Sequence, residues 1–165
     1  MWALMLISIA RSMSLRSVMY LLDTNVISEA RKGVRADPGV NAFWAEAALH
    51  DTPLFLASVT VGELRRGVER IRHRGDLPQA ARLELWLAQV ILDYGDRILP
   101  FDAEAAQVWG CLRVRDPHHV IDQQIASIAL LHDLTVVTRN TSDFLNTGVR
   151  LLNPFQGTGD RLTPP

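Results

Sequence analysis

Four acidic residues of this chain lie beside apolar segments, in a pattern that could bind a divalent cation. Asp23, Glu63 and Asp143 each end or follow an apolar segment typical of a buried strand. Asp122 precedes the nearly uncharged helical stretch 125–131, where a solvated acid has little local reason to lie. Carboxylates that converge without a cation repel one another, which raises their pKa values. Oxygen ligands suit hard cations, so the sequence predicts a Mg²⁺ or Mn²⁺ site.

Zinc is the alternative cation that the sequence leaves open. His118 and His119 lie shortly before Asp122, and zinc prefers His and Cys ligands. Adjacent histidines do not readily face the same ion, so we interpret this pair as loop residues. Cys111 is the only cysteine, which excludes an internal disulfide and a thiolate metal site and fits a reducing cytoplasm. We expect Cys111 to be a small buried residue.

Each acid also has an ordinary structural role available to it. Asp23 precedes Thr-Asn and could cap a helix over residues 26–31. The pairs Thr60–Glu63 and Asn140–Asp143 have the spacing of a capping box, and the fourth acid could be an ordinary residue of a first helical turn. The joint occurrence of all four acids, each beside an apolar segment, favours the cation site over four separate structural explanations.

The elements that would position these acids alternate between strand and helix patterns. Segments typical of strands occur at residues 19–22, 54–59, 97–99, 135–138 and 149–152. Apolar residues recur with the period of a helix in four other segments, 40–48, 83–91, 105–112 and 125–131, and we expect the aromatic residues there to belong to the core. This alternation favours an α/β fold, with a central, mainly parallel β-sheet flanked by α-helices on both faces. In such a sheet all four acids can lie at one edge.

The composition is that of one ordinary folded domain. The chain has 165 residues, of which 48% are hydrophobic, enough for a single core. The net charge of -1 argues against binding nucleic acid by bulk attraction. Lys32 is the only lysine, and the predominance of arginine either serves bidentate phosphate contacts or reflects the composition of the source genome.

The two ends of the chain differ from its body. Residues 2–10 are apolar but too short to span a bilayer, and no positive charge precedes them as in a secretory signal. We interpret residues 1–18 as an N-terminal extension, with Met19 as a candidate for the true start. Residues 156–165 are rich in Gly, Thr and Pro and are predicted to form a flexible tail.

Four short segments each carry one of the acids. They are Leu-Leu-Asp-Thr-Asn-Val at 21–26, Val-Thr-Val-Gly-Glu-Leu at 59–64, Ile-Asp-Gln-Gln-Ile-Ala at 121–126 and Thr-Arg-Asn-Thr-Ser-Asp-Phe at 138–144, with Asn-Pro-Phe following at 153–155. In this order they resemble a PIN domain over residues 19–155, in particular the VapC and FitB-like toxins of bacterial toxin–antitoxin pairs. Gln123–Gln124 and the preceding Pro117–His118–His119 depart from the family's usual pattern, but neither departure removes a carboxylate.

The resemblance implies a magnesium-dependent ribonuclease that hydrolyses RNA phosphodiesters. The family's acidic positions match Asp23, Glu63, Asp122 and Asp143, and its flanking polar positions match Thr24, Asn25, Thr138 and Asn140. Asp23 and Asp122 are expected to bind the cation directly. Glu63 could bind it through water or orient the nucleophile, and Asp143 could bind a second ion or act through water. Arg139 is a hypothetical contact for substrate phosphate.

The resemblance also implies partners. Such toxins form homodimers and are inhibited by a small cognate antitoxin, whose C-terminal segment covers the acidic groove and inserts an arginine among the carboxylates. No membrane partner is expected.

Two other classes of function are disfavoured by the residues present. A phospho-acceptor with Asp23 as nucleophile is disfavoured, since no second Asp follows two residues later and no lysine lies near the later strands. A non-enzymatic PIN-fold module that binds protein or RNA is disfavoured because all four acids are present.

Overall fold

A six-stranded sheet forms the centre of the molecule. The computed structural model describes residues 18–156 and 161–162, so most of the predicted N-terminal extension and of the predicted tail lies outside the described residues. The strand order is β3-β2-β1-β4-β5-β6, and only β6 runs antiparallel to its neighbour. The strands are β1 (Tyr20–Leu22), β2 (Leu54–Ala57), β3 (Ile98–Leu99), β4 (Thr135–Val137), β5 (Arg150–Leu152) and β6 (Arg161–Leu162). The five parallel strands are those that the sequence predicts, and β6 is an addition.

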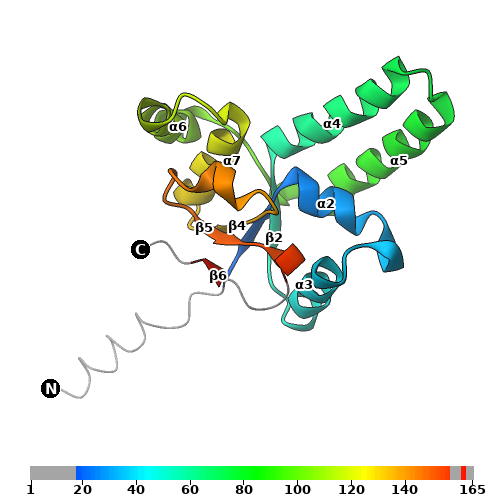
Figure 1. Cartoon of the computed structure of the whole chain (residues 1–165), viewed down its shortest axis with the longest axis horizontal. Coiled ribbons are helices and arrows are strands. Elements are labelled where there is room, and N and C mark those ends of the chain that lie inside the picture. The colour runs from blue at the N-terminus through cyan, green and yellow to red at the C-terminus, as the bar shows by residue number, and fades with distance from the viewer. Residues whose placement is uncertain (1–17, 157–160, 163–165) are drawn as a thin grey trace, which may run out of the picture.

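Helices cover both faces of this sheet (Figure 1). They are α2 (Thr24–Ala30), α3 (Pro38–Leu49), α4 (Ser58–His73), α5 (Leu77–Tyr94), α6 (Ala103–Arg115) and α7 (Val120–Leu131). Four 3₁₀ turns complete the described chain: η1 (Gly33–Arg35), η2 (Gly95–Arg97), η3 (Thr141–Phe144) and η4 (Pro154–Gln156). The predicted α/β architecture is therefore confirmed. No helix in the described ranges is long and apolar enough to cross a membrane.

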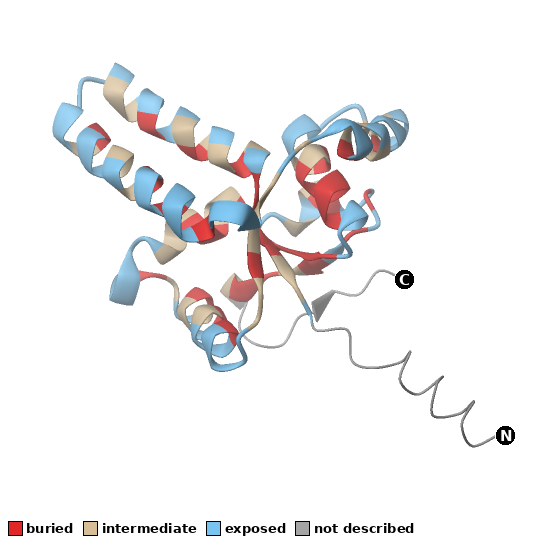
Figure 2. Ribbon diagram, turned by 180° about the vertical axis from the view of Figure 1, so that it is seen from behind, coloured by how far each residue is buried: buried red, intermediate tan, exposed pale blue. Residues whose placement is uncertain are grey.

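Alternation along the strands divides the core between the two faces of the sheet. Leu21 and Val136 belong to one apolar cluster, which includes residues of α6 and α7. The next residues along, Leu22 and Val137, belong to a second cluster, which includes residues of α2, α3, α4 and α5. Successive side chains of a strand point to opposite faces, so strands this short can anchor helices on both sides. Buried residues accordingly gather in the sheet and α7, whereas the α4–α5 hairpin projects from the body and is largely exposed (Figure 2).

Two of the structural alternatives for the acids are absent from the structure, and the expectation that Cys111 is buried is wrong. Helix α4 begins at Ser58, with Ala57 as its N-cap, so Thr60 lies inside the helix and Glu63 in the second turn. The proposed capping box of these two residues therefore does not exist. Asn140 precedes η3 without a capping bond from its side chain. Cys111 is exposed, because it precedes Leu112 on α6 and points away from the apolar cluster that Leu112 joins.

The aromatic residues of the predicted helices are only partly core. Phe43 is buried, whereas Trp44, Trp86 and Trp109 are of intermediate exposure. Phe43 packs edge-on against both Tyr20 and Trp44. The indoles thus lie at the margins of the two clusters, where a large ring covers apolar neighbours and retains some contact with solvent.

Helix α3 packs so closely against η4 that there is no room for a side chain at Gly39. A Cβ added at Gly39 in α3 would overlap the carbonyl oxygen of Pro154 in η4. We expect Gly39→Ala to lower the free energy of unfolding by about 1–3 kcal/mol, because backbone must shift. Gly67→Ala in α4 is the matched control: its Cβ would meet no atom, and the gain in helix propensity should stabilise by about 0.5–1 kcal/mol. Urea unfolding measures both, and equal stability of the two variants would contradict the contact.

Candidate metal centre

The four predicted acids meet at the carboxyl edge of the parallel strands. Asp23 directly follows β1, and Glu63 lies on α4, the helix that follows β2. Asp143 lies in η3, shortly after β4, and Asp122 lies in the first turn of α7. Parallel strands bring the ends of their chains to one edge of a sheet, which is where open α/β sheets bind ligands. The topology thus gathers acids that are up to 120 positions apart in the sequence.

Asp23 is the most firmly held of the four acids. Its side chain is buried, with 4% of the residue exposed, and it accepts three hydrogen bonds. The Thr24 backbone N–H donates to Oδ1 at 2.6 Å, while the Asn25 amide and the Thr138 hydroxyl each donate to Oδ2 at 2.7 Å. Burial raises the pKa of Asp23 and the negative charge of Glu63 adds to that effect, while the three donors oppose it. The carboxylate is therefore fixed in one orientation before any ligand arrives.

The Thr138 hydroxyl is the hub of this support. It donates to Asp23 and accepts from the Asn25 amide at 3.1 Å and from the Asn140 backbone N–H at 3.0 Å. Thr138 is fully buried, so one donor and two acceptor sites of its hydroxyl are all used. Asn25 continues the network, since its side-chain oxygen accepts the Arg139 backbone N–H at 3.0 Å. These bonds tie the segment after β4 to the start of α2.

The carboxyl group of Asp122 has a strongly raised pKa. Burial, followed by the negative charges of Asp23, Asp143 and Glu63, raises its pKa from 3.8 to about 6. Glu63 is itself held by the Thr24 hydroxyl, which donates to its Oε2 at 2.7 Å. All four acids therefore act on one another electrostatically, as expected of carboxylates gathered to share a cation.

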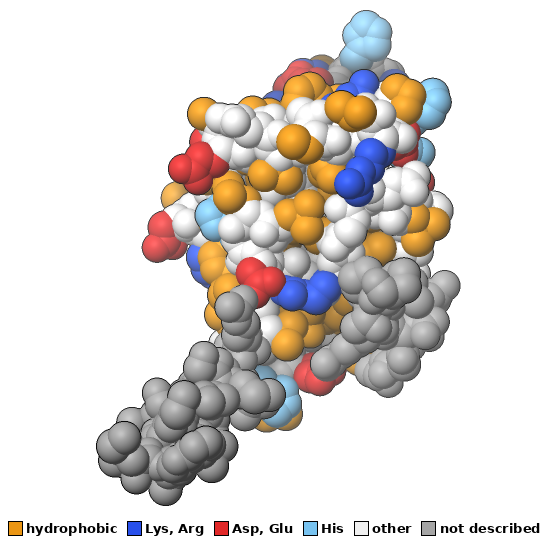
Figure 3. Space-filling view, turned by 90° about the vertical axis from the view of Figure 1, so that its left-hand side faces the viewer, with side chains coloured by type: hydrophobic (Ala, Val, Ile, Leu, Met, Phe, Trp, Pro, Cys, Tyr) orange, Lys and Arg blue, Asp and Glu red, His pale blue; other side chains and the backbone are white. Residues whose placement is uncertain are grey.

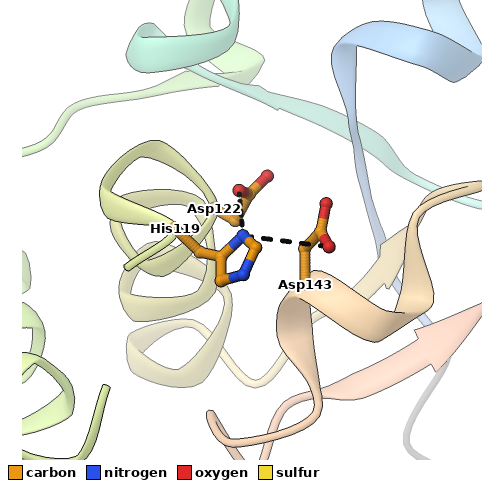
Figure 4. Close-up of side chains that lie close together, drawn as sticks. All are labelled: His119, Asp122 and Asp143. Atoms are coloured by element: carbon orange, nitrogen blue, oxygen red, sulfur yellow. Dashed lines mark ion pairs between the residues drawn. The ribbon is translucent and has the colours of Figure 1, made fainter. Parts of the chain in front are cut away.

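His119 also belongs to the cluster, although the sequence analysis interprets it as a loop residue. It is the N-cap residue of α7, in the left-handed conformation with a φ of 53°. Its Nδ1 lies 3.8 Å from Asp122 Oδ2 and 3.8 Å from Asp143 Oδ1, so that the imidazole stands between the two carboxylates (Figure 4). One ligand atom from each of these three residues lies within 4.8 Å of the others. The spacing of three residues between His119 and Asp122 was the available signal, whereas the backbone N–H of His118 instead donates to Asp116.

Arg139 lies beside the site but its guanidinium packs elsewhere. Cζ is 4.9 Å from the centroid of the Phe155 ring, and the positive charge helps to lower the pKa of Glu29 after the hydrogen bonds from Lys32 and Asp37. In the structure the direct contribution of Arg139 to the network is thus its backbone N–H.

The donor set fits a hard divalent cation. Burial and the charges of the neighbouring carboxylates raise the pKa of Asp122, and a bound cation would offset that penalty. Oxygen donors dominate, with one imidazole nitrogen at the rim, and such a set suits Mg²⁺ or Mn²⁺.

A separate hollow lies away from the acids, between α2, α3 and α5. Its volume is about 360 Å³, and Trp44, Trp86 and Tyr94 line it together with two arginines. Arg31 lies over the Trp86 ring and Arg97 over the Tyr94 ring. This surface is apolar and cationic, so its chemistry suits a protein segment with apolar side chains better than a metal ion.

Comparisons with known proteins agree with this geometry. Residues 20–149 match the PIN domain. The VapC ribonuclease Y4jK of Sinorhizobium fredii is 34% identical over 147 residues, which are 84% of this chain and 99% of that protein. Toxin FitB of Neisseria gonorrhoeae is 35% identical over 144 residues, 83% of this chain and 99% of that protein. The crystal structure of FitAcB from Neisseria gonorrhoeae matches with a TM-score of 0.70 and 36% identity, covering 83% of this chain and 99% of that one.

Proposed function

The chain belongs to the PIN domain family, and on that premise we propose that it is a metal-dependent endoribonuclease, the toxin of a toxin–antitoxin pair. The family assignment supports a nuclease. The observation that carries the proposal is the gathering of Asp23, Glu63, Asp122 and Asp143 at one sheet edge, where burial, followed by the negative charges of the other three acids, raises the pKa of Asp122 to about 6. A protein without a cation to bind has no evident use for such an arrangement.

The four acids have different parts in the proposed reaction. When bound, Mg²⁺ or Mn²⁺ supplies a Lewis acid that polarises a phosphoryl oxygen and makes water a stronger nucleophile. Asp23 and Asp122 would hold the cation, with Asp23 oriented in advance by its three donors. Glu63, fixed by Thr24, orients the attacking water. Asp143 acts from the other side of His119, through water or on a second ion.

Cleavage of RNA tests this proposal directly. Purified protein is incubated with a mixed set of RNAs, with Mg²⁺ or Mn²⁺, with chelator, and with the cation restored after chelation. We expect cleavage only when the cation is present, and its full return on restoration. A folded protein that binds RNA but cuts none of the set with any cation would contradict the nuclease and favour a binding module of the same fold.

Arg139 is proposed to contact a substrate phosphate. Its side chain is exposed and would have to leave the Phe155 ring to do so. We expect Arg139→Ala to raise the KM for RNA about 10-fold, the value of one charge-assisted hydrogen bond, with little change in kcat. Arg139→Lys is the comparison, since it keeps the charge without the planar fork. Unchanged cleavage by Arg139→Ala would remove this residue from the proposed site.

The proposed partner is a small antitoxin protein. Two solved structures support it: FitAcB from Neisseria gonorrhoeae and FitAB bound to an IR36 DNA fragment are 36% and 33% identical to this chain. An arginine from the antitoxin would satisfy the carboxylates as a cation does, and the hollow beside Trp86 offers apolar surface for its neighbouring segment. We further propose that the toxin is a homodimer and acts in the cytoplasm, where its RNA substrates occur.

A further inference from the structure

The arginines of α4 divide into two sets with different surroundings. Arg65 and Arg72 face α5 and are neutralised there. Both nitrogens of the Arg65 fork donate to Glu84 at 2.6 Å, and Arg72 donates to Glu84 at 2.8 Å and also to Glu69. These hydrogen bonds lower the pKa of Glu84 to about 2. Arg65 and Arg72 therefore link α4 to α5, and their charges are balanced by the glutamates and not available to a ligand.

The second set is exposed and unpaired. Arg66, Arg70 and Arg74 form no salt bridge within residues 18–156 and 161–162, although Arg65 and Arg72 on the same helix do. Their spacing of four residues places them along one face of the helix, within an arc of about 80° at 3.6 residues per turn. Opposite charges three or four residues apart on a helix can pair. Arg70 and Arg74 have no acid at these spacings, and Arg66 has Glu63 and Glu69 three residues away, but Glu69 pairs with Arg65 and Arg72 and Glu63 accepts the Thr24 hydroxyl.

The same helical face begins at the metal centre. Glu63 falls within the arc of the three arginines and accepts the Thr24 hydroxyl at the sheet edge. From Glu63 the face extends about 16 Å to Arg74, at 1.5 Å per residue, along the hairpin that projects from the body (Figure 1). Gly67 lies on this face as well, and a Cβ there would meet no atom within 4 Å. A polyanion could therefore approach the helix closely between the acids and the outer arginines.

Positive charge is concentrated on α4 and is not spread over the whole surface. The chain as a whole has a net charge of -1, and on the side that carries α6 the Lys and Arg side chains are few and scattered among apolar and uncharged groups (Figure 3). Between residues 63 and 74, in contrast, three exposed arginines remain after Arg65 and Arg72 have paired with Glu69 and Glu84. An excess of one sign in one place concentrates ligands of the opposite sign there.

We propose that Arg66, Arg70 and Arg74 form a phosphate track that binds the single-stranded segment of RNA adjoining the cleavage site. The inference rests on the proposed ribonuclease function and adds to it the direction in which substrate leaves the metal centre. Arginine suits phosphate because its fork can donate two hydrogen bonds to one phosphate group. The track reads no bases, so it supplies affinity and orientation without choosing the sequence.

Salt dependence of RNA binding tests the track. All proteins carry Asp122→Asn, so that bound RNA stays intact, and a fluorescein-labelled single-stranded RNA of mixed sequence reports binding by anisotropy. One protein carries Arg66→Gln, Arg70→Gln and Arg74→Gln. The matched control carries Arg35→Gln, Arg82→Gln and Arg115→Gln, which removes equal charge at exposed sites of η1, α5 and α6. Circular dichroism and thermal unfolding verify that both are folded.

Each lost phosphate contact lowers the slope of log K against log salt by about 0.7 for a single strand, so the track variant should lose about 2 from the slope. Between 50 and 200 mM salt, the parent should accordingly lose about 16-fold more affinity than the track variant, while the control keeps the parental slope. Equal slopes in the parent and the track variant, or equal losses in both triple variants, would overturn the track alone. A parent that binds no RNA would overturn the proposed function with it.

Discussion

Asp122→Asn is expected to abolish RNA cleavage and, at the same time, to stabilise the protein in the absence of divalent cations. The loss of cleavage should be about 100-fold or more, because a ligand to the cation supplies several kcal/mol of transition-state stabilisation. The gain in stability has another origin. In the metal-free protein the charged form of Asp122 is penalised by burial and by its three acidic neighbours, and asparagine is never charged.

The pH dependence of this gain follows from the direction of the shift. The pKa of Asp122 is about 6 in the folded protein and near 3.8 when unfolded. Between these values the folded protein retains a proton that the unfolded chain has lost, so stability falls as the pH rises from about 4 to about 6. Above about pH 6 the whole penalty is present, about 1–2 kcal/mol after allowance for solvent around a side chain that is 24% exposed.

Thermal unfolding in chelator measures the effect. At pH 8 the variant should melt about 2–8 °C above the wild type, and at pH 4 the two should coincide. Added Mn²⁺ should raise the Tm of the wild type more than that of the variant, since a ligand stabilises the state that binds it. Asp96→Asn is the matched control, the same chemical change at an exposed position of η2. A variant that melts below the wild type at pH 8 would show that the carboxylates do not strain one another.

The sequence was sufficient for the sheet and for the gathering of the acids because both follow from strong local patterns. Strand and helix patterns alternate along the chain, which is why helices were expected on both faces, and the adjacent apolar residues Leu21 and Leu22 indeed join clusters on opposite faces. Asp23 and Asp143 follow strands, and parallel strands end at one edge. No long-range information was needed for either conclusion.

The sequence failed where a boundary or a backbone conformation decided the outcome. Helix α4 begins immediately after β2, so Glu63 reaches the site from the second helical turn and Thr60 is buried without a capping role. His119 reaches Asp122 and Asp143 from a left-handed N-cap, a conformation uncommon for this residue. The pairing of Arg65 and Arg72 depends on the position of Glu84 in α5, so the sequence alone does not separate the arginines of residues 65–74 into two sets.

Thr138→Val is expected to weaken cation binding, although Thr138 is not itself a proposed ligand of the cation. The change keeps the shape of the side chain but removes the hydroxyl that serves Asp23, Asn25 and the Asn140 backbone N–H. In a fully buried position the unpaired groups should cost about 1–3 kcal/mol of unfolding free energy. The pKa of Asp23 should rise further, because one of the donors that oppose its shift is lost.

The functional consequence of Thr138→Val should be a 10- to 100-fold loss of Mn²⁺ affinity and of cleavage, the usual effect of removing a group that orients a ligand. Calorimetric titration with Mn²⁺ and cleavage assays measure the two. Thr138→Ser is the control: it restores the hydroxyl and loses only a methyl group, so metal affinity should return even where some stability does not. If Thr138→Val binds Mn²⁺ as the wild type does, the hydroxyl supports the fold alone. If both variants lose affinity equally, the methyl group and its packing, and not the hydrogen bonds, hold Asp23 in place.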